Sequence, residues 1–323
     1  MRIGTLGAAR IAPAALIKPA RSVPEVQVAA VAARDRSRAA EFAAKHGIPM
    51  VHDSYEALID DPSIDAVYNP LPNALHAEWT IRALEAGKHV LCEKPFASNE
   101  KEARTVADAA DKSGLVVMEA FHYRYHPLAE RMASIVGELG EIEQIETALC
   151  FPLPRFSDIR YSLPLSGGAL MDAGCYAVHL ARFLGGGEPA VESARALLRK
   201  PQVDRAMTAT LRFPSGASGR VTASMWSSHV LKIAARVTGS RGQMRVTNFI
   251  APQVFHRLSY TVDGVKKRER VAGEATYTYQ LRAFLSAVQT GEGNLTPPAT
   301  SIANMAVIDE IYRKAGLSPR GMI

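Results

Sequence analysis

The sequence predicts an α/β protein made of an N-terminal doubly wound parallel sheet and a C-terminal α+β domain with an open, mostly antiparallel sheet. Two observations predict this class. Before residue 120, short apolar runs alternate with segments of helical periodicity, which is typical of parallel strands covered by helices on both faces. After it, strand-like runs follow one another with only turns between them, which indicates antiparallel pairing. We therefore place domains at residues 1–120 and 121–323.

The N-terminal elements are predicted from apolar runs and the turn residues beside them. Five buried strands are expected at residues 2–6, 26–33, 66–69, 89–92 and 115–119, because each is a short, continuous apolar run. Helices are expected at 11–21, 37–46, 74–86 and 99–113. Ser37 is the expected N-cap of the second helix, and Gly47 its expected C-terminal residue.

The C-terminal part is predicted to be rich in strands. Strands are expected at residues 144–151, 190–198, 205–213, 218–226, 232–239, 242–248 and 258–262, with glycine-containing turns at 214–216 and 240–242. Helices are expected at 126–136, 174–184, 277–290 and 300–315.

Charge and composition argue against several classes of protein. The chain carries 38 Lys and Arg against 32 Asp and Glu, a mild positive excess that suits an anionic cofactor or substrate. Its one basic run, at residues 266–270, is short and contains an acid, so no nucleic-acid partner is expected. No run is apolar for long enough to span a bilayer, so no membrane partner is expected either.

Cysteine usage points to a reducing compartment. Cys92, Cys150 and Cys175 are odd in number and lack C-x-x-C spacing, which disfavours a disulfide framework and a zinc ribbon. The first residues also lack the apolar region of a signal peptide. A cytoplasmic location is therefore expected.

The turn after the first strand carries a dinucleotide-binding pattern. The segment Gly7-Ala8-Ala9-Arg10-Ile11-Ala12 matches G-x-G-x-x-G/A, with alanine at the second glycine position. Small residues are needed there because the backbone must approach a pyrophosphate at the start of a helix. We therefore expect a Rossmann domain in which Gly7, Ala9, Arg10 and Ile11 bind the cofactor. A turn chosen only for packing is the alternative.

The end of the second strand predicts which cofactor is bound. The segment Ala33-Arg34-Asp35 lies where the adenosine ribose is read. Arg34 favours the 2′-phosphate of NADP, because a guanidinium group bonds phosphate oxygens bidentately. Asp35 would instead favour NAD, unless its side chain caps the next helix. NADP is our prediction and NAD the alternative.

Three further motifs resemble a known family. Residues 71–78 (LPNALHAE) and 86–95 (AGKHVLCEKP), followed by residues 167–176 (GGALMDAGCY), resemble the glucose–fructose oxidoreductase / inositol dehydrogenase (Gfo/Idh/MocA) family. The resemblance covers essentially the whole chain. It implies a Rossmann domain followed by an α/β domain whose open sheet commonly forms an oligomer interface, so a homodimer or homotetramer is expected.

The resemblance also implies roles for the first two motifs. Residues that border the cofactor would be Leu71, Pro72, Asn73, His76, Glu93, Lys94 and Pro95. Lys94 would hydrogen-bond the reacting hydroxyl and polarise it, and a cis peptide bond is expected before Pro95. A surface lysine at a strand end is the alternative for Lys94.

The last motif supplies two further catalytic candidates. Asp172 and Tyr176 are spaced i, i+4, so they would share one helical face. By resemblance to the family branch with tyrosine here, which includes glucose–fructose oxidoreductase, NADP xylose dehydrogenase and dihydrodiol dehydrogenase, Tyr176 would be the general acid/base. Asp172 would orient the substrate or Lys94. The alternatives are that Tyr176 only packs and that Asp172 caps a helix beginning near Gly174.

Two polar segments complete the expected site. Tyr123 and Arg124 follow the fifth strand, where the family's equivalent segment borders the active site. Arg160 and Tyr161 precede the last motif and are expected to read substrate hydroxyls or an anionic group, although a plain loop is an equal alternative. The histidines near Tyr123 lack a third ligand of suitable spacing, so no metal is expected.

These expectations converge on an enzyme that acts on CH–OH groups. We expect hydride transfer between NADP(H) and a hydroxyl or carbonyl carbon of a sugar or cyclic polyol, with Lys94 and Tyr176 assisting proton transfer. One alternative is a ketoreductase of a nucleotide-linked deoxysugar, because residues 158–176 also resemble such members. A non-catalytic dinucleotide-sensing protein is the second alternative, although a sensor would need neither Lys94 nor Tyr176.

Overall fold

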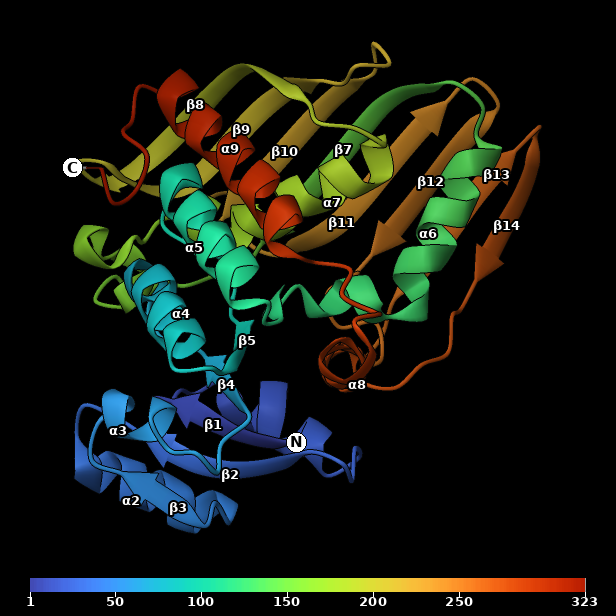
Figure 1. Ribbon diagram of the computed structural model, residues 1–323. Helices are drawn as coiled ribbons and strands as arrows, with labels where there is room; N and C mark the ends of the chain where they lie inside the picture. The colour runs from blue at the N-terminus through green and yellow to red at the C-terminus, as the bar shows by residue number, and fades with distance from the viewer. Residues whose placement is uncertain (323) are drawn as a thin grey trace. The chain divides into compact units, whose positions relative to one another are not determined.

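The computed structural model describes residues 1–322 and falls into two compact units (Figure 1). Unit 1 contains residues 1–97, 101–125 and 277–301, and unit 2 contains residues 98–100 and 126–276 together with the chain from residue 302. The chain therefore returns to unit 1 late in the sequence, which a single boundary after residue 120 does not describe. The physical reason is that Leu281 and Phe284 join the apolar core of unit 1.

Unit 1 is built on a six-stranded parallel sheet of order β3-β2-β1-β4-β5-β6. Its strands are β1 Arg2–Leu6, β2 Gln27–Ala32, β3 Met50–His52, β4 Ala66–Asn69, β5 His89–Cys92 and β6 Val117–Glu119. The five predicted strands are present. The sixth, β3, is an edge strand of three half-buried residues, too short to show an apolar period.

Helices cover both faces of this sheet. They are η1 Pro13–Ile17, α1 Lys18–Ala20, α2 Arg36–His46, α3 Tyr55–Ile59, η2 Asn73–Leu75, α4 His76–Glu85, α5 Glu100–Ser113, η3 His122–Tyr125 and α8 Thr276–Thr290. On one face Ile3 packs in a cluster with Leu16 and Phe284. On the other, Gly4 lies so close to Leu58 of α3 that an added Cβ would come within 2.5 Å of its side chain.

Unit 2 is built on an eight-stranded sheet of order β14-β13-β12-β11-β7-β10-β9-β8. Its strands are β7 Ile142–Cys150, β8 Ala190–Lys200, β9 Val203–Arg212, β10 Ser218–Ser224, β11 Lys232–Gly239, β12 Gly242–Thr247, β13 Arg257–Val262 and β14 Val265–Glu269. Among the described strand pairs of this second sheet, only β7–β10 is parallel. The open, mostly antiparallel sheet predicted from the sequence is confirmed.

One face of the second sheet carries helices (Figure 1). The remaining helical elements are α6 Pro127–Glu138, η4 Ile159–Tyr161, η5 Leu163–Leu165, η6 Leu170–Gly174, α7 Cys175–Gly185 and α9 Pro298–Lys314. Thr147 of β7 points to this face and donates a hydrogen bond of 2.8 Å to the carbonyl oxygen of Ala177 in α7. Because side chains alternate along a strand, Glu146 points to the opposite face.

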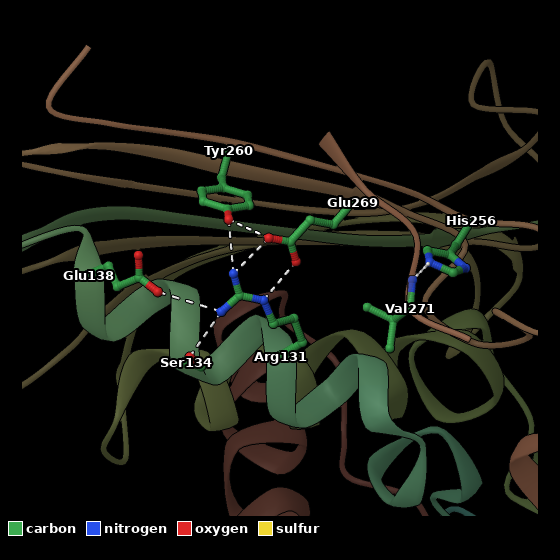
Figure 2. A network of polar contacts seen from close by, with 7 residues as sticks. All are labelled: Arg131, Ser134, Glu138, His256, Tyr260, Glu269 and Val271. Carbon is green, nitrogen blue, oxygen red and sulfur yellow. Dashed lines mark hydrogen bonds and ion pairs between the residues drawn. The ribbon is translucent and has the colours of Figure 1, made fainter. Parts of the chain in front are cut away.

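A charged network fixes α6 to the edge of this sheet (Figure 2). Arg131 donates to both carboxylate oxygens of Glu269, from Nε at 2.7 Å and Nη2 at 2.8 Å. The hydroxyl of Tyr260 also contacts Glu269. Arg131 and then Tyr260 lower the pKa of Glu269 from 4.5 to about 2. A bidentate pair of this kind fixes orientation as well as distance.

No helix within residues 1–322 combines the length and apolar character needed to cross a membrane. Cys92, Cys150 and Cys175 are buried as free thiols.

Candidate active site

Four of the predicted cofactor segments lie at one edge of the parallel sheet. Arg34 follows β2, Gly7 follows β1, Leu71 follows β4 and Glu93 follows β5. These strands are neighbours in the order β2-β1-β4-β5 and all run in the same direction. Their carboxyl ends therefore meet at a single edge, which is where doubly wound sheets bind their ligands.

The turn after β1 has the backbone that the dinucleotide pattern requires. Gly7 has φ of +88°, a conformation that glycine adopts without a steric cost. Its N–H donates to the carbonyl oxygen of Ala32 at 2.6 Å, so the turn is tied to β2. Ala12, the last residue of the pattern, is fully buried beneath the following helix. Ala9 is half-buried, and Arg10 and Ile11 are exposed, so part of the turn remains accessible to a ligand.

Asp35, and not Ser37, is the N-cap of α2. Its carboxylate accepts hydrogen bonds from the backbone N–H groups of Ser37 and Arg38, and the Ser37 hydroxyl donates to it at 2.6 Å. The Ser37 hydroxyl is the main cause that lowers the pKa of Asp35. The prediction of Ser37 as the cap is wrong because the helix begins one residue earlier, at Arg36. Arg34 precedes this cap and is exposed.

His76 holds two of the predicted cofactor segments together. Its ring nitrogens lie 2.7 Å from the carbonyl oxygens of both Leu71 and Pro95. Burial lowers the pKa of His76 to about 4, and Lys94 acts in the same direction. A neutral imidazole has one N–H and donates to only one of these carbonyls. His76 is 1% exposed, so it connects the segments from within the protein. Pro72 and Asn73, between them, are half-buried.

The segment that carries Lys94 is anchored on both sides. The Tyr68 hydroxyl donates to a carboxylate oxygen of buried Glu93 at 2.7 Å. The backbone N–H of Phe96 donates to the carboxylate of Glu119 at 2.9 Å. The expected cis peptide bond between Lys94 and Pro95 is present. Lys94 itself is half-buried and follows β5 directly, so the anchored segment places this residue at the carboxyl end of the sheet.

The two histidines near Tyr123 have separate structural roles. The ring of His122 lies 4.0 Å from that of Tyr277, and burial, aided by Lys94, lowers the pKa of His122 to about 3. His126 caps α6, because its Nδ1 accepts the backbone N–H of Leu128 at 3.0 Å. No cluster of three or more His, Cys, Asp or Glu able to hold a metal ion is found between residues 1 and 322. Next to His122, Tyr123 is buried and Arg124 is half-buried.

In unit 2, Asp172 contacts Arg160. The Nε atom of Arg160 lies 3.0 Å from Asp172, and its Nη1 lies 3.2 Å from Asp158. Asp172 is the main cause that raises the pKa of Arg160. The alternative in which Asp172 caps a helix near Gly174 is wrong, because the helical run already begins with the π-turn η6 at Leu170. Such π-turns occur frequently at functional sites.

The two tyrosines of this region differ in their surroundings. Tyr161 is buried and donates to the carbonyl oxygen of Leu153 at 2.9 Å, and burial raises its pKa to about 12. These contacts favour a loop-holding role. Tyr176 is the second residue of α7 and is 6% exposed. Asp172 lies four residues before it, in the π-turn η6.

Sequence reasoning missed two buried charges that border the last motif. Asp204 on β9 and Arg320 near the C-terminus form an ion pair of 2.8 Å, and neither side chain is exposed. β9 contains other polar residues besides Asp204, so an acid in this strand gave no signal, and residue 320 lies outside every recognisable motif.

Comparison with known families places this architecture in one class. Residues 1–121 match the model of an oxidoreductase family with an NAD-binding Rossmann fold (GFO/IDH/MocA), and residues 131–245 match the GFO/IDH/MocA C-terminal domain.

Individual relatives extend over nearly the whole chain. It is 39% identical to D-xylose 1-dehydrogenase (NADP(+)) 2 of Haloferax volcanii, over 98% of this chain and 97% of that protein. It is 34% identical to dTDP-3,4-didehydro-2,6-dideoxy-alpha-D-glucose 3-reductase of Streptomyces violaceoruber, over 98% and 95%. Among solved structures, a 3-ketoreductase of Actinomadura kijaniata in complex with NADP and TDP-benzene superimposes with a TM-score of 0.89 at 28% identity, over 97% of both chains. The chain belongs to the Gfo/Idh/MocA family of oxidoreductases, which confirms the predicted family and fold class.

Proposed function

We propose that this protein is an NADP-preferring dehydrogenase/reductase that acts on a hydroxyl or carbonyl carbon of a sugar or cyclic polyol. The anchored Glu93–Pro95 segment carries the proposal, because it presents Lys94 at the edge where the cofactor segments meet. The relationship to an NADP(+)-dependent xylose dehydrogenase supports the same substrate class. The free thiols of the three cysteines support a reducing compartment such as the cytoplasm.

The cofactor preference follows from the end of β2. The residues there suit NADP, because the Asp35 carboxylate is engaged as a helix cap and Arg34 is exposed beside it. Arg34 would bond the 2′-phosphate, and the Gly7 turn would admit the pyrophosphate. The remaining cofactor contacts would come from the predicted segments, namely Ala9, Arg10, Ile11, Leu71, Pro72, Asn73, Glu93, Lys94 and Pro95, with His76 holding two of these segments in place.

NADP, when bound, supplies or accepts the hydride, and the side chains manage the substrate and its proton. Lys94 would hydrogen-bond the reacting oxygen. Tyr176 would donate or accept the proton at its phenol oxygen. Asp172, already oriented by Arg160, would accept hydrogen bonds from sugar hydroxyls. Tyr123 and Arg124 would border the sugar.

A ketoreductase of a nucleotide-linked deoxysugar is the second candidate. It is supported by the 34% identity to the Streptomyces 3-reductase and by the likeness to the Actinomadura ketoreductase. Turnover of free aldoses with NADP would favour the first candidate. Reduction of a nucleotide-linked ketosugar alone would favour the second.

The decisive experiment combines cofactor titration with a variant that lacks only the phenol oxygen of Tyr176. NADPH and NADH are titrated by fluorescence, and oxidation of free aldoses is then followed with NADP. Tyr176→Phe should keep NADPH binding and lose most turnover, about 100-fold or more. Tyr260→Phe, which removes a hydroxyl from the α6 network, serves as the matched control. Full activity of Tyr176→Phe would remove Tyr176 from proton transfer. Cofactor binding without turnover of any sugar by the wild type would favour a dinucleotide sensor, and absence of binding to either cofactor would contradict the proposal.

The uncovered face of the second sheet supports assembly into a homodimer or homotetramer. Arg220, Glu146, Arg236 and Arg245 lie side by side across β10, β7, β11 and β12. Arg236 and Arg245 are directly opposite, an arrangement that is unfavourable for like charges. In an isologous interface this row of one copy faces the same row of the other copy, so Glu146 of each copy could approach arginines of the other. A hollow of about 450 Å³ borders this row.

Light scattering would test this assembly. Glu146→Arg removes the one acid of the row and should shift the protein toward monomer, whereas Glu85→Arg on the exposed surface of α4 should not. Assembly that persists in Glu146→Arg would exclude this face.

A further inference from the structure

The buried cluster of Asp204, Tyr312 and Arg320 lies beside the last sequence motif. Arg320 Nη2 donates to Asp204 Oδ1 at 2.8 Å, and the Tyr312 hydroxyl donates to the same oxygen at 3.1 Å. The guanidinium carbon of Arg320 lies 4.0 Å from the centre of the Tyr312 ring. A buried ion pair loses its hydration and is therefore weak support for stability alone. Its other contacts indicate what it does.

These contacts are made to the backbone of the last motif. Arg320 Nε donates to the carbonyl oxygen of Gly167 at 2.8 Å. Asp204 Oδ2 accepts the backbone N–H of Leu170 at 2.7 Å. Between them, Gly168 has φ of +144°, and a Cβ there would lie 2.2 Å from Asp204 Oδ1. The cluster thus bonds the backbone of the motif at two points, Gly167 and Leu170, and leaves no room for a side chain at Gly168 between them.

Gly168 in turn fixes the Arg160–Asp172 pair. Its N–H donates to the carbonyl oxygen of Arg160 at 2.8 Å, and its carbonyl oxygen accepts the N–H of Asp172 at 3.0 Å. Both members of the pair are therefore bonded through their backbones to one residue. A shift of Gly168 would move the two side chains relative to each other.

The same cluster holds the chain that follows the Lys94 segment. The carbonyl oxygen of Arg320 accepts a hydrogen bond of 2.8 Å from the side-chain amide of Asn99. The hydroxyls of Ser98 and Ser166 are 3.0 Å apart. Asn99 is five residues after Lys94, so one polar cluster contacts both the last motif and the chain that follows the Lys94 segment.

We propose that Asp204 and Arg320 are positioning residues that hold the Arg160–Asp172 pair in the geometry needed to bind the sugar. The effect on turnover rests on the proposed function, in which Asp172 contacts the substrate. Neither residue would touch the substrate: Arg320 acts through Gly167, Asp204 acts through Leu170, and both lie against Gly168. A displacement of about 1 Å at such a site costs about 100-fold in rate.

Arg320→Lys tests this role without removing the charge that balances Asp204. A single ammonium group lacks the fork that bonds both Asp204 and Gly167. We expect kcat/KM for the sugar to fall about 10- to 100-fold, while the Kd for NADPH stays within twofold. Tyr312→Phe, which removes only the hydroxyl contact to Asp204, should give a smaller fall. Arg131→Lys is the matched control, because it weakens another charged pair of unit 2 that does not contact residues 160–172.

Hydrogen exchange of residues 160–174 provides a readout independent of activity. Arg320→Lys should accelerate exchange of the Gly168 and Asp172 amides, and Arg131→Lys should not. Unchanged exchange and unchanged kcat/KM in Arg320→Lys would overturn the inference, as would an equal loss in Arg131→Lys. If the wild type oxidised or reduced no sugar, the proposed function would fail, and the exchange rates would still decide the positioning role.

Discussion

The carboxylate of Asp35 accepts a hydrogen bond of 2.9 Å from the backbone N–H of Ser37. Asp35, which could otherwise accept a hydrogen bond from a ribose hydroxyl of the cofactor, therefore serves as the N-cap of α2. Its neighbour Arg34 remains exposed at the carboxyl end of β2. This hydrogen bond therefore favours NADP over NAD, a choice that the residue types alone left open.

Arg34→Ala should weaken NADPH binding about 10- to 100-fold, because hydrogen bonds to a charged group contribute about 1.5–3 kcal/mol. Binding of NADH, which lacks the 2′-phosphate, should change little. Fluorescence titration of both cofactors measures the difference. The control is Asp35→Ala, which should lower the stability of the fold through loss of the cap and leave the cofactor preference intact. A switch to NADH in Asp35→Ala, or equal losses for both cofactors in Arg34→Ala, would contradict this assignment.

Acid should destabilise the protein before its carboxylates are protonated. Burial lowers the pKa values of His76, His122 and His126 to about 4, 3 and 4 from 6.5. The unfolded chain therefore binds more protons than the folded chain once the pH falls below 6.5. The stabilisation is complete above that pH and is lost as the pH falls toward 4, with a slope of about 1.4 kcal/mol per pH unit for each histidine.

Guanidinium unfolding between pH 7 and pH 4 measures this slope. His126→Asn keeps a side-chain oxygen that can cap α6 and should reduce the slope by the equivalent of one proton. His229→Asn, which alters an exposed histidine outside this set, is the matched control. An equal slope in His126→Asn and the wild type would show that His126 does not contribute to the pH dependence of stability.

Much of the fold could be predicted because its strands are continuous apolar runs. The bounds of β1, β4, β5 and β11 agree with those expected. The short elements β3 and α3 were missed, since three to five residues do not establish a period. The return of α8 to unit 1 was also missed. The amphipathic pattern of a helix shows that one of its faces is buried, but it does not show which core that face packs against.

Local backbone features of the candidate site could be predicted from the sequence. The turn at Gly7 and the cis bond before Pro95 are properties of neighbouring residues, whereas the cap of α2 was assigned to Ser37 and lies on Asp35. The bridging role of His76 and the contact of Asp172 with Arg160 depend on tertiary packing. Such contacts leave no spacing signal, so the residue types were identified without their partners.

The Arg131–Glu269 pair should contribute measurably to stability. About 30% of each side chain is exposed, 29% and 31%, so solvent screens the pair and Glu269→Gln should cost about 1–2 kcal/mol. The pKa of Glu269 is lowered from 4.5 to about 2 by Arg131. Its stabilisation is therefore present above pH 4.5 and lost as the pH falls toward 2, and this acid dependence should disappear in Glu269→Gln. Asp263→Asn, which breaks the exposed pair with Arg241, should change urea unfolding little.

Two glycines with positive φ should respond very differently to alanine. At Gly216, φ is +87° and an added Cβ meets nothing within 4 Å, so Gly216→Ala should cost only the backbone conformation, about 1–2 kcal/mol. At Gly168 an added Cβ would lie 2.2 Å from Asp204 and 2.8 Å from the Tyr312 hydroxyl. Gly168→Ala must displace buried polar atoms as well, so its cost should exceed that of Gly216→Ala by about 1–3 kcal/mol. Urea unfolding of both variants measures the difference. Equal losses would show that the Asp204 cluster yields to the extra methyl group, and Gly168 would then not be tightly held.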